Sequence, residues 1–71
     1  MKLHYYQDTD SLYIELRKNA SAESREVSDD VVLDFDEVGN LVGIDVDHAS
    51  ENLDLTSLET VELPVKPSRI A

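Results

Sequence analysis

Residues Val31 to Ser50 read VVLDFDEVGNLVGIDVDHAS, and this stretch decides the fold. Apolar and acidic residues alternate through both halves of the stretch, on either side of a turn at Gly39 and Asn40. A period of two is typical of a strand with one buried and one solvated face, and a polar turn between two such runs predicts a β-hairpin. We therefore expect a hairpin with one apolar face and one acidic face, followed by a segment of small residues.

The register of this hairpin follows from its turn. Pairing Asp36 with Leu41 leaves a four-residue loop and places the apolar residues of both strands on one face. In this register Phe35 lies opposite Val42, Leu33 opposite Ile44, and Val31 opposite Val46. Every inward position is then matched by an inward position, which is the arrangement that stabilises a sheet.

A second hairpin is predicted at the N-terminus, where apolar and polar residues alternate on both sides of the polar turn at residues 7–10. The predicted pairs are Tyr6 with Ser11, Tyr5 with Leu12, and Leu3 with Ile14. Residues 18–24 are small and polar and predict a loop, and residues 25–28 predict a short strand. The fold class is therefore mainly β, an antiparallel sheet built from two hairpins.

The pattern changes after Asp47. Ala49 and Leu53 have helical spacing, so we expect a short helical segment there with Asp47 as its N-cap. Residues 56–59 match a capping box, while residues 60–63 also alternate like a strand, and the sequence leaves both alternatives open for residues 56–63. We predict one small β-rich domain over residues 1–63 and a flexible tail over residues 64–71.

The length of the chain favours self-association. A domain of 71 residues buries only about 60% of the surface that its unfolded form exposes, so its core is thin. Small domains of this kind are usually supported by disulfides, a structural metal or oligomerisation. The chain has no Cys, which excludes disulfides and thiolate zinc sites. We therefore predict a homodimer.

The charge of the chain is −10 and is concentrated in one region. Residues 29–62 contain eleven acidic residues and neither Lys nor Arg. Such a region repels nucleic acid and anionic lipid and attracts a basic protein. The N-terminus lacks the apolar run of a signal peptide, and no window is apolar enough to span a membrane. These features, with the lack of Cys, predict a cytoplasmic protein that binds neither nucleic acid nor membrane.

The candidate site residues lie on the polar faces of the two hairpins. The acidic candidates are Asp34, Asp36, Asp45 and Asp47, and the aromatic candidates are Tyr6 and Tyr13. Exposed Tyr is enriched at protein interfaces, so we interpret these residues as a partner-binding surface. The predicted register puts Asp45 opposite Val32 and diagonal to Asp34, so a divalent-cation site formed by the four Asp residues is the alternative.

Catalytic signatures are missing from the chain. It has no G-x-S-x-G elbow, no lysine dyad and no glycine-rich phosphate loop, and it contains only two glycines. A transition-metal site would require both His4 and His48 with a nearby Asp, and nothing in the sequence brings the two histidines together. We therefore expect neither an enzyme nor a cofactor.

The order of the motifs resembles the domain-of-unknown-function 2283 family of small prokaryotic proteins, whose members run Y-D-x-x-x-D-x-L-Y-I, then D-x-D-x-x-G-x-x-x-G-I-E, then A-S. The matching positions are Tyr6, Asp10, Leu12, Tyr13, Ile14, Asp34, Asp36, Gly39, Gly43, Ile44, Ala49 and Ser50. Gln7 stands where the family pattern has Asp, and Asp45 stands where it has Glu. The resemblance covers about residues 3–50. It implies a fold without an established activity, and for some relatives an antitoxin-like role as partners of small toxins.

Overall fold

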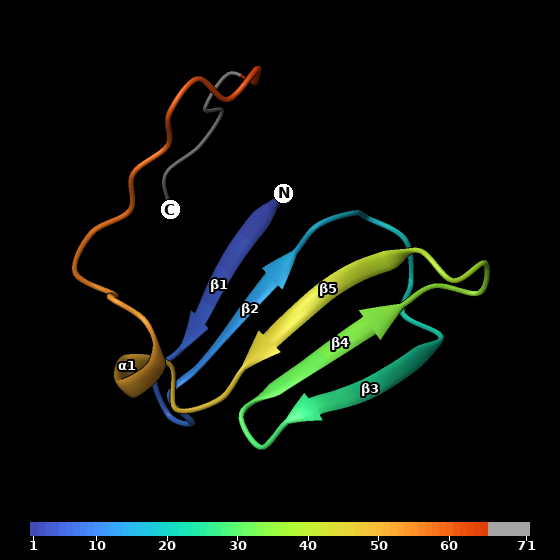
Figure 1. Cartoon of the computed structure of the whole chain (residues 1–71), viewed down its shortest axis with the longest axis horizontal. Coiled ribbons are helices and arrows are strands. Elements are labelled where there is room, and N and C mark those ends of the chain that lie inside the picture. The colour runs from blue at the N-terminus through green and yellow to red at the C-terminus, as the bar shows by residue number, and fades with distance from the viewer. Residues whose placement is uncertain (66–71) are drawn as a thin grey trace.

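The structure is a computed structural model, and it describes residues 1–65 of the chain. Figure 1 shows one antiparallel sheet and one short helix. The elements are β1 (Lys2–Tyr6), β2 (Ser11–Glu15), β3 (Glu23–Ser28), β4 (Val31–Phe35), β5 (Leu41–Val46) and α1 (Ala49–Asn52). The strand order is β1-β2-β5-β4-β3. The mainly β prediction, with a short helix after residue 47, is confirmed. Of the tail predicted over residues 64–71, residues 66–71 lie outside the described residues.

The N-terminal hairpin has the predicted register. Tyr6 pairs with Ser11, and Leu3 pairs with Ile14. The two hairpins join side by side because β2 also pairs with β5, where Ile14 lies opposite Ile44. The chain crosses from β2 to the far edge of the sheet through residues 16–22 and returns through β3 and β4 (Figure 1). The joining of the hairpins aligns their apolar faces into one continuous surface.

The hairpin of β4 and β5 differs from its predicted register near the turn. Leu33 lies opposite Ile44 as predicted, but Phe35 lies opposite Leu41 instead of Val42. The reason is a tighter turn: the backbone N–H of Asp36 donates to the carbonyl of Asn40 at 2.9 Å, which leaves three residues in the loop.

A β-bulge at Val42 restores the alternation beyond this turn, because the shift falls between the pairs Asp34–Gly43 and Phe35–Leu41. The bulge also connects β5 to the end of β2. The Val42 carbonyl accepts hydrogen bonds from the backbone N–H groups of Leu16 (2.9 Å) and Arg17 (3.4 Å). In the turn itself Gly39 has φ 95°, in the left-handed region that glycine adopts without steric cost.

The strand predicted at residues 25–28 begins two residues earlier, at Glu23. It forms the edge of the sheet opposite β1, and its pairing with β4 shifts between Glu26 and Ser28. This irregularity and the charged residues of the strand are devices that discourage pairing with another chain.

The segment after β5 differs from the sequence prediction in its caps. His48, with φ 50°, occupies the N-cap position of α1 in place of Asp47, and no side chain caps the helix there. The backbone N–H of Ala49 instead donates to the carbonyl of Asp10 at 2.8 Å. Residues 56–63 form neither a helix nor a strand. The Thr56 of the predicted capping box donates its N–H to the Asp54 carboxylate at 2.9 Å.

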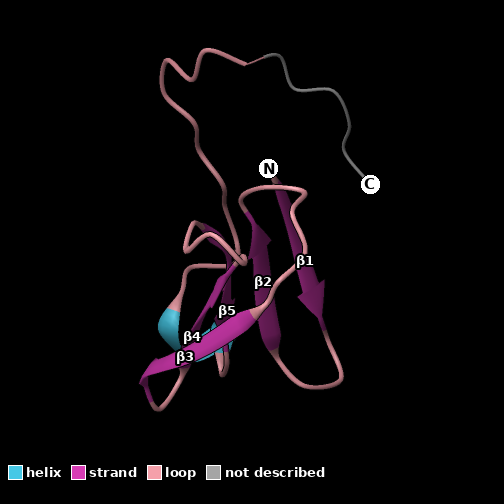
Figure 2. Ribbon diagram, turned by 90° about the vertical axis from the view of Figure 1, so that its right-hand side faces the viewer, coloured by secondary structure: helices cyan, strands magenta, loops and turns pink. Residues whose placement is uncertain are grey.

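The core is thin, as expected for a domain of this size. The buried apolar residues among those described are Leu12, Val42, Val46 and Ala49. The remaining apolar side chains of the sheet are only half-buried or exposed. Seen from the side in Figure 2, the described residues form a single twisted sheet without a second sheet or a long helix packed on it. One face of the sheet therefore keeps much of its apolar surface in contact with solvent.

Candidate functional site

The acidic side chains of the sheet and most of its apolar side chains lie on opposite faces. Residues that pair across adjacent strands point to the same face. Tyr13 pairs with Asp45, and Asp45 pairs with Val32 as predicted. Asp34 lies diagonal to Asp45, because it pairs with Gly43. We call the side of the sheet that carries Tyr13, Asp34 and Asp45 the outer face, and the side that carries Leu12, Ile14 and Ile44 the apolar face.

Tyr13 lies across the middle of the outer face. Its hydroxyl donates to Oδ2 of Asp34 at 2.9 Å, and the Ser24 hydroxyl donates to Oδ1 of the same carboxylate at 2.6 Å. A Cβ atom on Gly43 would overlap the hydroxyl and Cζ of Tyr13, so the phenol ring occupies the space that the missing side chain leaves. Burial, together with the hydrogen bond to Asp34 and its charge, raises the pKa of Tyr13 to about 12.

Asp45 lies on β5, between β2 and β4, and its acidic neighbours are Asp34 and Asp47. Burial raises the pKa of its carboxyl, and the neighbouring Asp47 and Asp34 raise it further through their negative charge. Asp47 accepts a hydrogen bond from the Ser11 hydroxyl at 3.1 Å. The structure thus brings three of the four predicted carboxylates together on the outer face.

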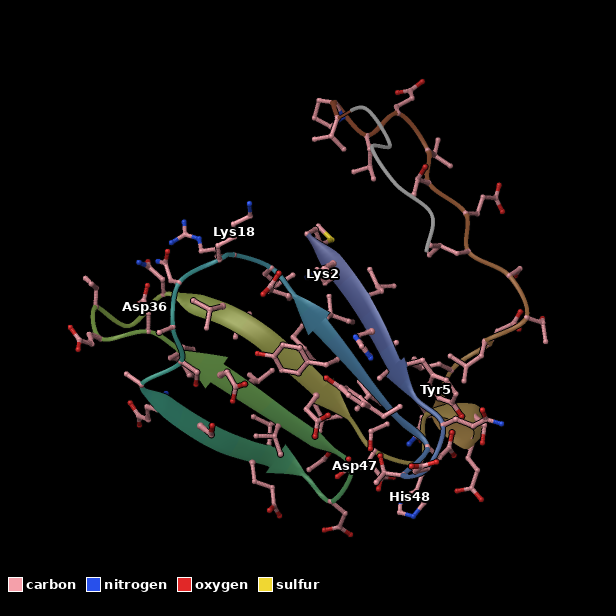
Figure 3. All side chains as sticks on the ribbon, turned by 180° about the vertical axis from the view of Figure 1, so that it is seen from behind. Lys2, Tyr5, Lys18, Asp36, Asp47 and His48 are labelled. Atoms are coloured by element: carbon pink, nitrogen blue, oxygen red, sulfur yellow. The ribbon has the colours of Figure 1, made fainter. Side chains whose placement is uncertain are left out.

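Asp36 is separate from this group. Figure 3 shows Asp36 and Asp47 at opposite ends of the sheet. The Asp36 carboxylate closes the β4–β5 turn by accepting hydrogen bonds from the backbone N–H groups of Val38 (3.0 Å) and Asn40 (2.9 Å). It also accepts one from the Asn19 side chain at 2.9 Å, which fixes the crossing between β2 and β3. The Asn19 hydrogen bond and those of the turn lower the pKa of Asp36 to about 2, so its role is structural.

A polar cluster that the sequence did not predict lies at the junction of β5 and α1. The Asp10 carboxylate accepts hydrogen bonds from the Ser50 hydroxyl (2.7 Å), the Ser50 backbone N–H (3.1 Å) and the Tyr5 hydroxyl (2.7 Å). The Ser50 hydroxyl, followed by Tyr5, lowers the pKa of Asp10. Asp10 thereby ties the turn of the first hairpin to the start of α1. The signal was present in the family pattern, which contains Asp10, Ala49 and Ser50.

His48 belongs to the same end of the sheet, between β5 and α1. Its Nδ1 lies 2.8 Å from Oδ1 of Asp30, and the Asn52 side chain donates to Oδ2 of Asp30 at 3.1 Å. The hydrogen bond and the charge of Asp30 raise the pKa of His48. The ion pair is exposed, and such pairs contribute little to stability.

The second predicted aromatic residue, Tyr6, is exposed on β1. Its ring stacks on His4 with ring centroids 4.2 Å apart. His4 pairs with Tyr13, so the stacked pair borders Tyr13 on the outer face. The predicted aromatic and acidic candidates therefore share one surface, with the exception of Asp36.

The cation-site alternative required the four Asp residues to converge. Within residues 1–65, no group of three or more His, Cys, Asp or Glu side chains is placed to hold a metal ion. Asp36 is engaged in its turn, and the two oxygens of Asp34 accept hydrogen bonds from Tyr13 and Ser24. The outer face is thus a hydrogen-bonded acidic surface.

Comparison with known proteins found one family. The family model described as "Protein of unknown function (DUF2283)" matches residues 2–50, which include all five strands and the first residues of α1. Neither the curated proteins nor the solved structures gave a match. Across residues 1–65 no helix has the length and apolar character needed to cross a membrane.

Proposed function

The chain belongs to the DUF2283 family of proteins of unknown function, and from this premise we propose that it is a non-catalytic protein-interaction module that self-associates as a homodimer. The observation that carries the proposal is the surface of the isolated chain. Within residues 1–65 the buried apolar side chains are those of Leu12, Val42, Val46 and Ala49, and the other apolar side chains of the sheet keep contact with solvent.

An uncovered apolar face is the kind of surface that a dimer hides. A standard interface removes about 800 Å² from each partner, and permanent homodimers remove about 1,000 to 2,500 Å². The uncovered surface includes large apolar side chains of the sheet, such as Leu3 and Tyr5. Contiguous apolar surface of this kind is typical of protein–protein interfaces.

Self-association through the apolar face leaves the outer face free for a different partner. We infer that this second partner is a basic protein, as for an antitoxin-like module. The region from residue 29 to 62 has eleven acids and no Lys or Arg. Burial raises the pKa of Asp45, and repulsion from Asp47 and Asp34 raises it further. A basic surface would relieve this repulsion and would be attracted over a distance of about 10 Å at moderate salt.

Sedimentation velocity at micromolar concentration tests the homodimer. The expected species has a mass of about 16 kDa, twice the 8.0 kDa of one chain. A well-folded monomer that stays at the mass of one chain up to about 100 times this concentration would refute the proposal.

A pull-down from host lysate tests the basic partner. The variant Asp45→Asn/Asp47→Asn is compared with Asp8→Asn/Glu37→Gln, which removes the same charge from exposed turn positions. We expect the first variant to release a basic protein at lower salt than the second variant does. Equal retention by the two variants would exclude the outer face as the binding surface.

A further inference from the structure

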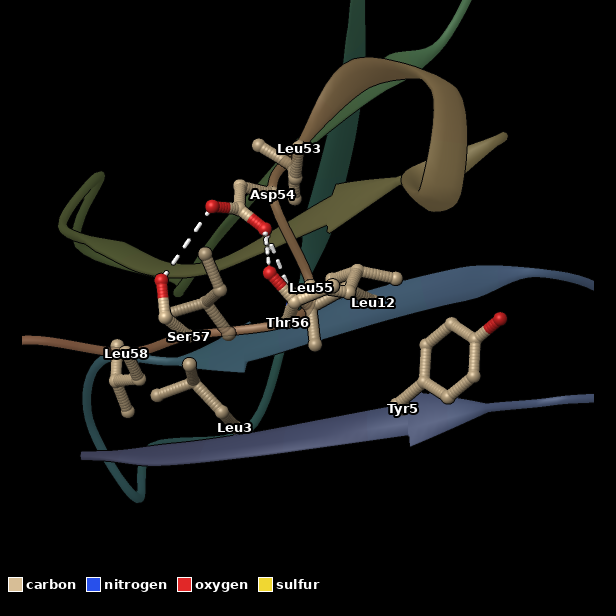
Figure 4. A pocket seen from close by; sticks show the side chains of 10 residues that line it. Leu3, Tyr5, Leu12, Leu53, Asp54, Leu55, Thr56, Ser57 and Leu58 are labelled. Atoms are coloured by element: carbon tan, nitrogen blue, oxygen red, sulfur yellow. Dashed lines mark hydrogen bonds between the residues drawn. The ribbon is translucent and has the colours of Figure 1, made fainter.

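The apolar face is hollowed beside β1. A cavity of about 810 Å³ lies between the sheet and the start of residues 53–65, which follow α1 and which we call the C-terminal arm. Figure 4 shows Leu3 and Tyr5 of β1 and Leu12 of β2 on one side of the cavity, and Leu55 and Leu58 of the arm on the other. The cavity is open to solvent, and an exposed apolar hollow of this kind is typical of a binding surface.

The arm of the same chain does not fill this cavity. Leu58 remains 76% exposed and Leu3 45% exposed, although both line the cavity. Beyond Leu58 the arm continues away from the sheet, orange to red in Figure 1. Val61, Leu63 and Val65 are all more than half exposed. The arm therefore presents a row of apolar side chains that no other described residue covers.

We propose that two copies exchange their arms, so that residues 58–65 of each copy fill the cavity beside β1 of the other. This inference rests on the proposed homodimer and states how it is built. A two-fold axis makes the contact reciprocal, so one arrangement covers both the cavity and the arm in each copy. Residues 58–65 span about 26 Å when extended, which exceeds the length of about 17 Å of a five-residue strand such as β1.

The edge of the sheet favours the same arrangement. β1 is an edge strand, and its charged side chain is Lys2 alone. The opposite edge strand, β3, carries Glu23, Arg25 and Glu26 and an irregular pairing. Charged residues and bulges protect an edge from pairing, so β1 is the edge that accepts another strand. Within the arm Val61 and Leu63 alternate with polar residues as in a strand.

Charge also favours a second copy as the occupant of the cavity. The charged group that lines the cavity is Asp54, whose carboxylate accepts hydrogen bonds from Thr56 and Ser57 of its own chain. A basic partner would find no further acidic group in this lining. The acidic residues Asp34 and Asp45 lie on the outer face, so the acidic groups that the exchange brings toward the apolar face are Asp54, Glu59 and Glu62.

Cross-linking between differently tagged copies tests the exchange. The chain has no Cys, so a Leu3→Cys copy with one tag and a Val61→Cys copy with another can be mixed, allowed to exchange subunits and treated with a short bis-maleimide. The expected product joins the two tags. The matched control replaces Leu3→Cys by Glu26→Cys, on the opposite edge. Equal cross-linking in the two mixtures would overturn the exchange, as would a Leu3→Cys/Val61→Cys chain that cross-links only within itself.

Removal of the apolar arm residues gives an independent test. The variant Leu58→Ser/Val61→Ser/Leu63→Ser is compared with Glu59→Gln/Thr60→Ser/Glu62→Gln, which changes the neighbouring polar positions. We expect the dimer dissociation constant of the first variant to rise about tenfold or more, and that of the second to change by less than about threefold. A wild-type dimer that the first variant leaves unchanged overturns arm exchange and keeps the homodimer. A wild-type monomer overturns both.

Discussion

Replacement of Gly43 by Ala tests the packing of Tyr13 on the outer face. The new Cβ would overlap the hydroxyl and Cζ of Tyr13, so the ring must move away. This movement breaks the 2.9 Å hydrogen bond to the Asp34 carboxylate. A hydrogen bond to a charged group contributes about 1.5–3 kcal/mol. Ala is favoured over Gly within a strand by about 0.5–1 kcal/mol, so the expected net loss is about 1–2 kcal/mol.

Urea denaturation followed by circular dichroism, at one fixed protein concentration, measures this loss. For a 71-residue chain the free energy of unfolding is about 4–10 kcal/mol, so the loss is a readily measured fraction of it. In a Tyr13→Ala background the overlap no longer exists. The same Gly43→Ala change should then stabilise the protein by about 0.5–1 kcal/mol, which corresponds to a coupling of about 1.5–3 kcal/mol between the two positions.

Gly39→Ala is the matched control. Gly39 has φ 95°, and apart from Gly39 and its two chain neighbours no residue has an atom within 4 Å of the position that a Cβ atom would take there, so Ala is destabilising through the backbone alone. Its effect should be the same with and without the Tyr13 ring. A coupling between Gly43 and Tyr13 below about 0.5 kcal/mol, the usual limit of additivity, would refute the reasoning.

Three further predictions concern other polar groups. Since hydrogen bonds lower the pKa of Asp36 from 3.8 to about 2, its contribution to stability is fully present above the unfolded value and is lost as the pH falls toward 2. Acid unfolding of Asp36→Asn should therefore show a shallower pH dependence than that of the wild type. Burial raises the pKa of Tyr13 from 10.0 to about 12, so its contribution is present below pH 10 and is lost as the pH rises through 12. An ultraviolet titration should show one phenol ionising near this upper value, and Tyr13→Phe should remove that step. Asp10→Ala should expose the Ser50 amide to rapid hydrogen exchange while the central strand amides stay protected, because the acceptor of that amide is lost.

The periodicity of the sequence determined the strands and their faces. Alternation is a local property, and a shift by one residue would turn every apolar side chain to solvent. For this reason the pairs Leu3–Ile14 and Leu33–Ile44 were predictable and are confirmed. The same reasoning placed Asp34 and Asp45 on one face of the second hairpin, and the pairing of β2 with β5 brings Tyr13 to the same face. The homodimer, the basic partner and the cytoplasmic location remain predictions.

Local pattern could not determine how the turn of β4 and β5 closes. The sequence favoured a four-residue loop, but the Asp36 carboxylate binds two backbone amides and draws the turn together. The shorter loop leaves one extra residue in β5, and the bulge at Val42 accommodates it. The Val42 carbonyl accepts hydrogen bonds from the backbone that follows β2. This compensation depends on a neighbouring strand, so it cannot be read from the hairpin alone.

By itself, therefore, the sequence determined two amphipathic hairpins, each with an apolar face and a polar face, whereas the structure shows that the apolar face is left uncovered. The tertiary structure decided which polar groups meet across the chain. Asp10 and Ser50 are forty residues apart, yet the pairing of β2 with β5 brings them within 2.7 Å. The same pairing sets the arm beside β1 and leaves the cavity there. Contacts of this kind depend on how the hairpins dock, and docking is governed by burial over the whole sheet, a property that no local window contains.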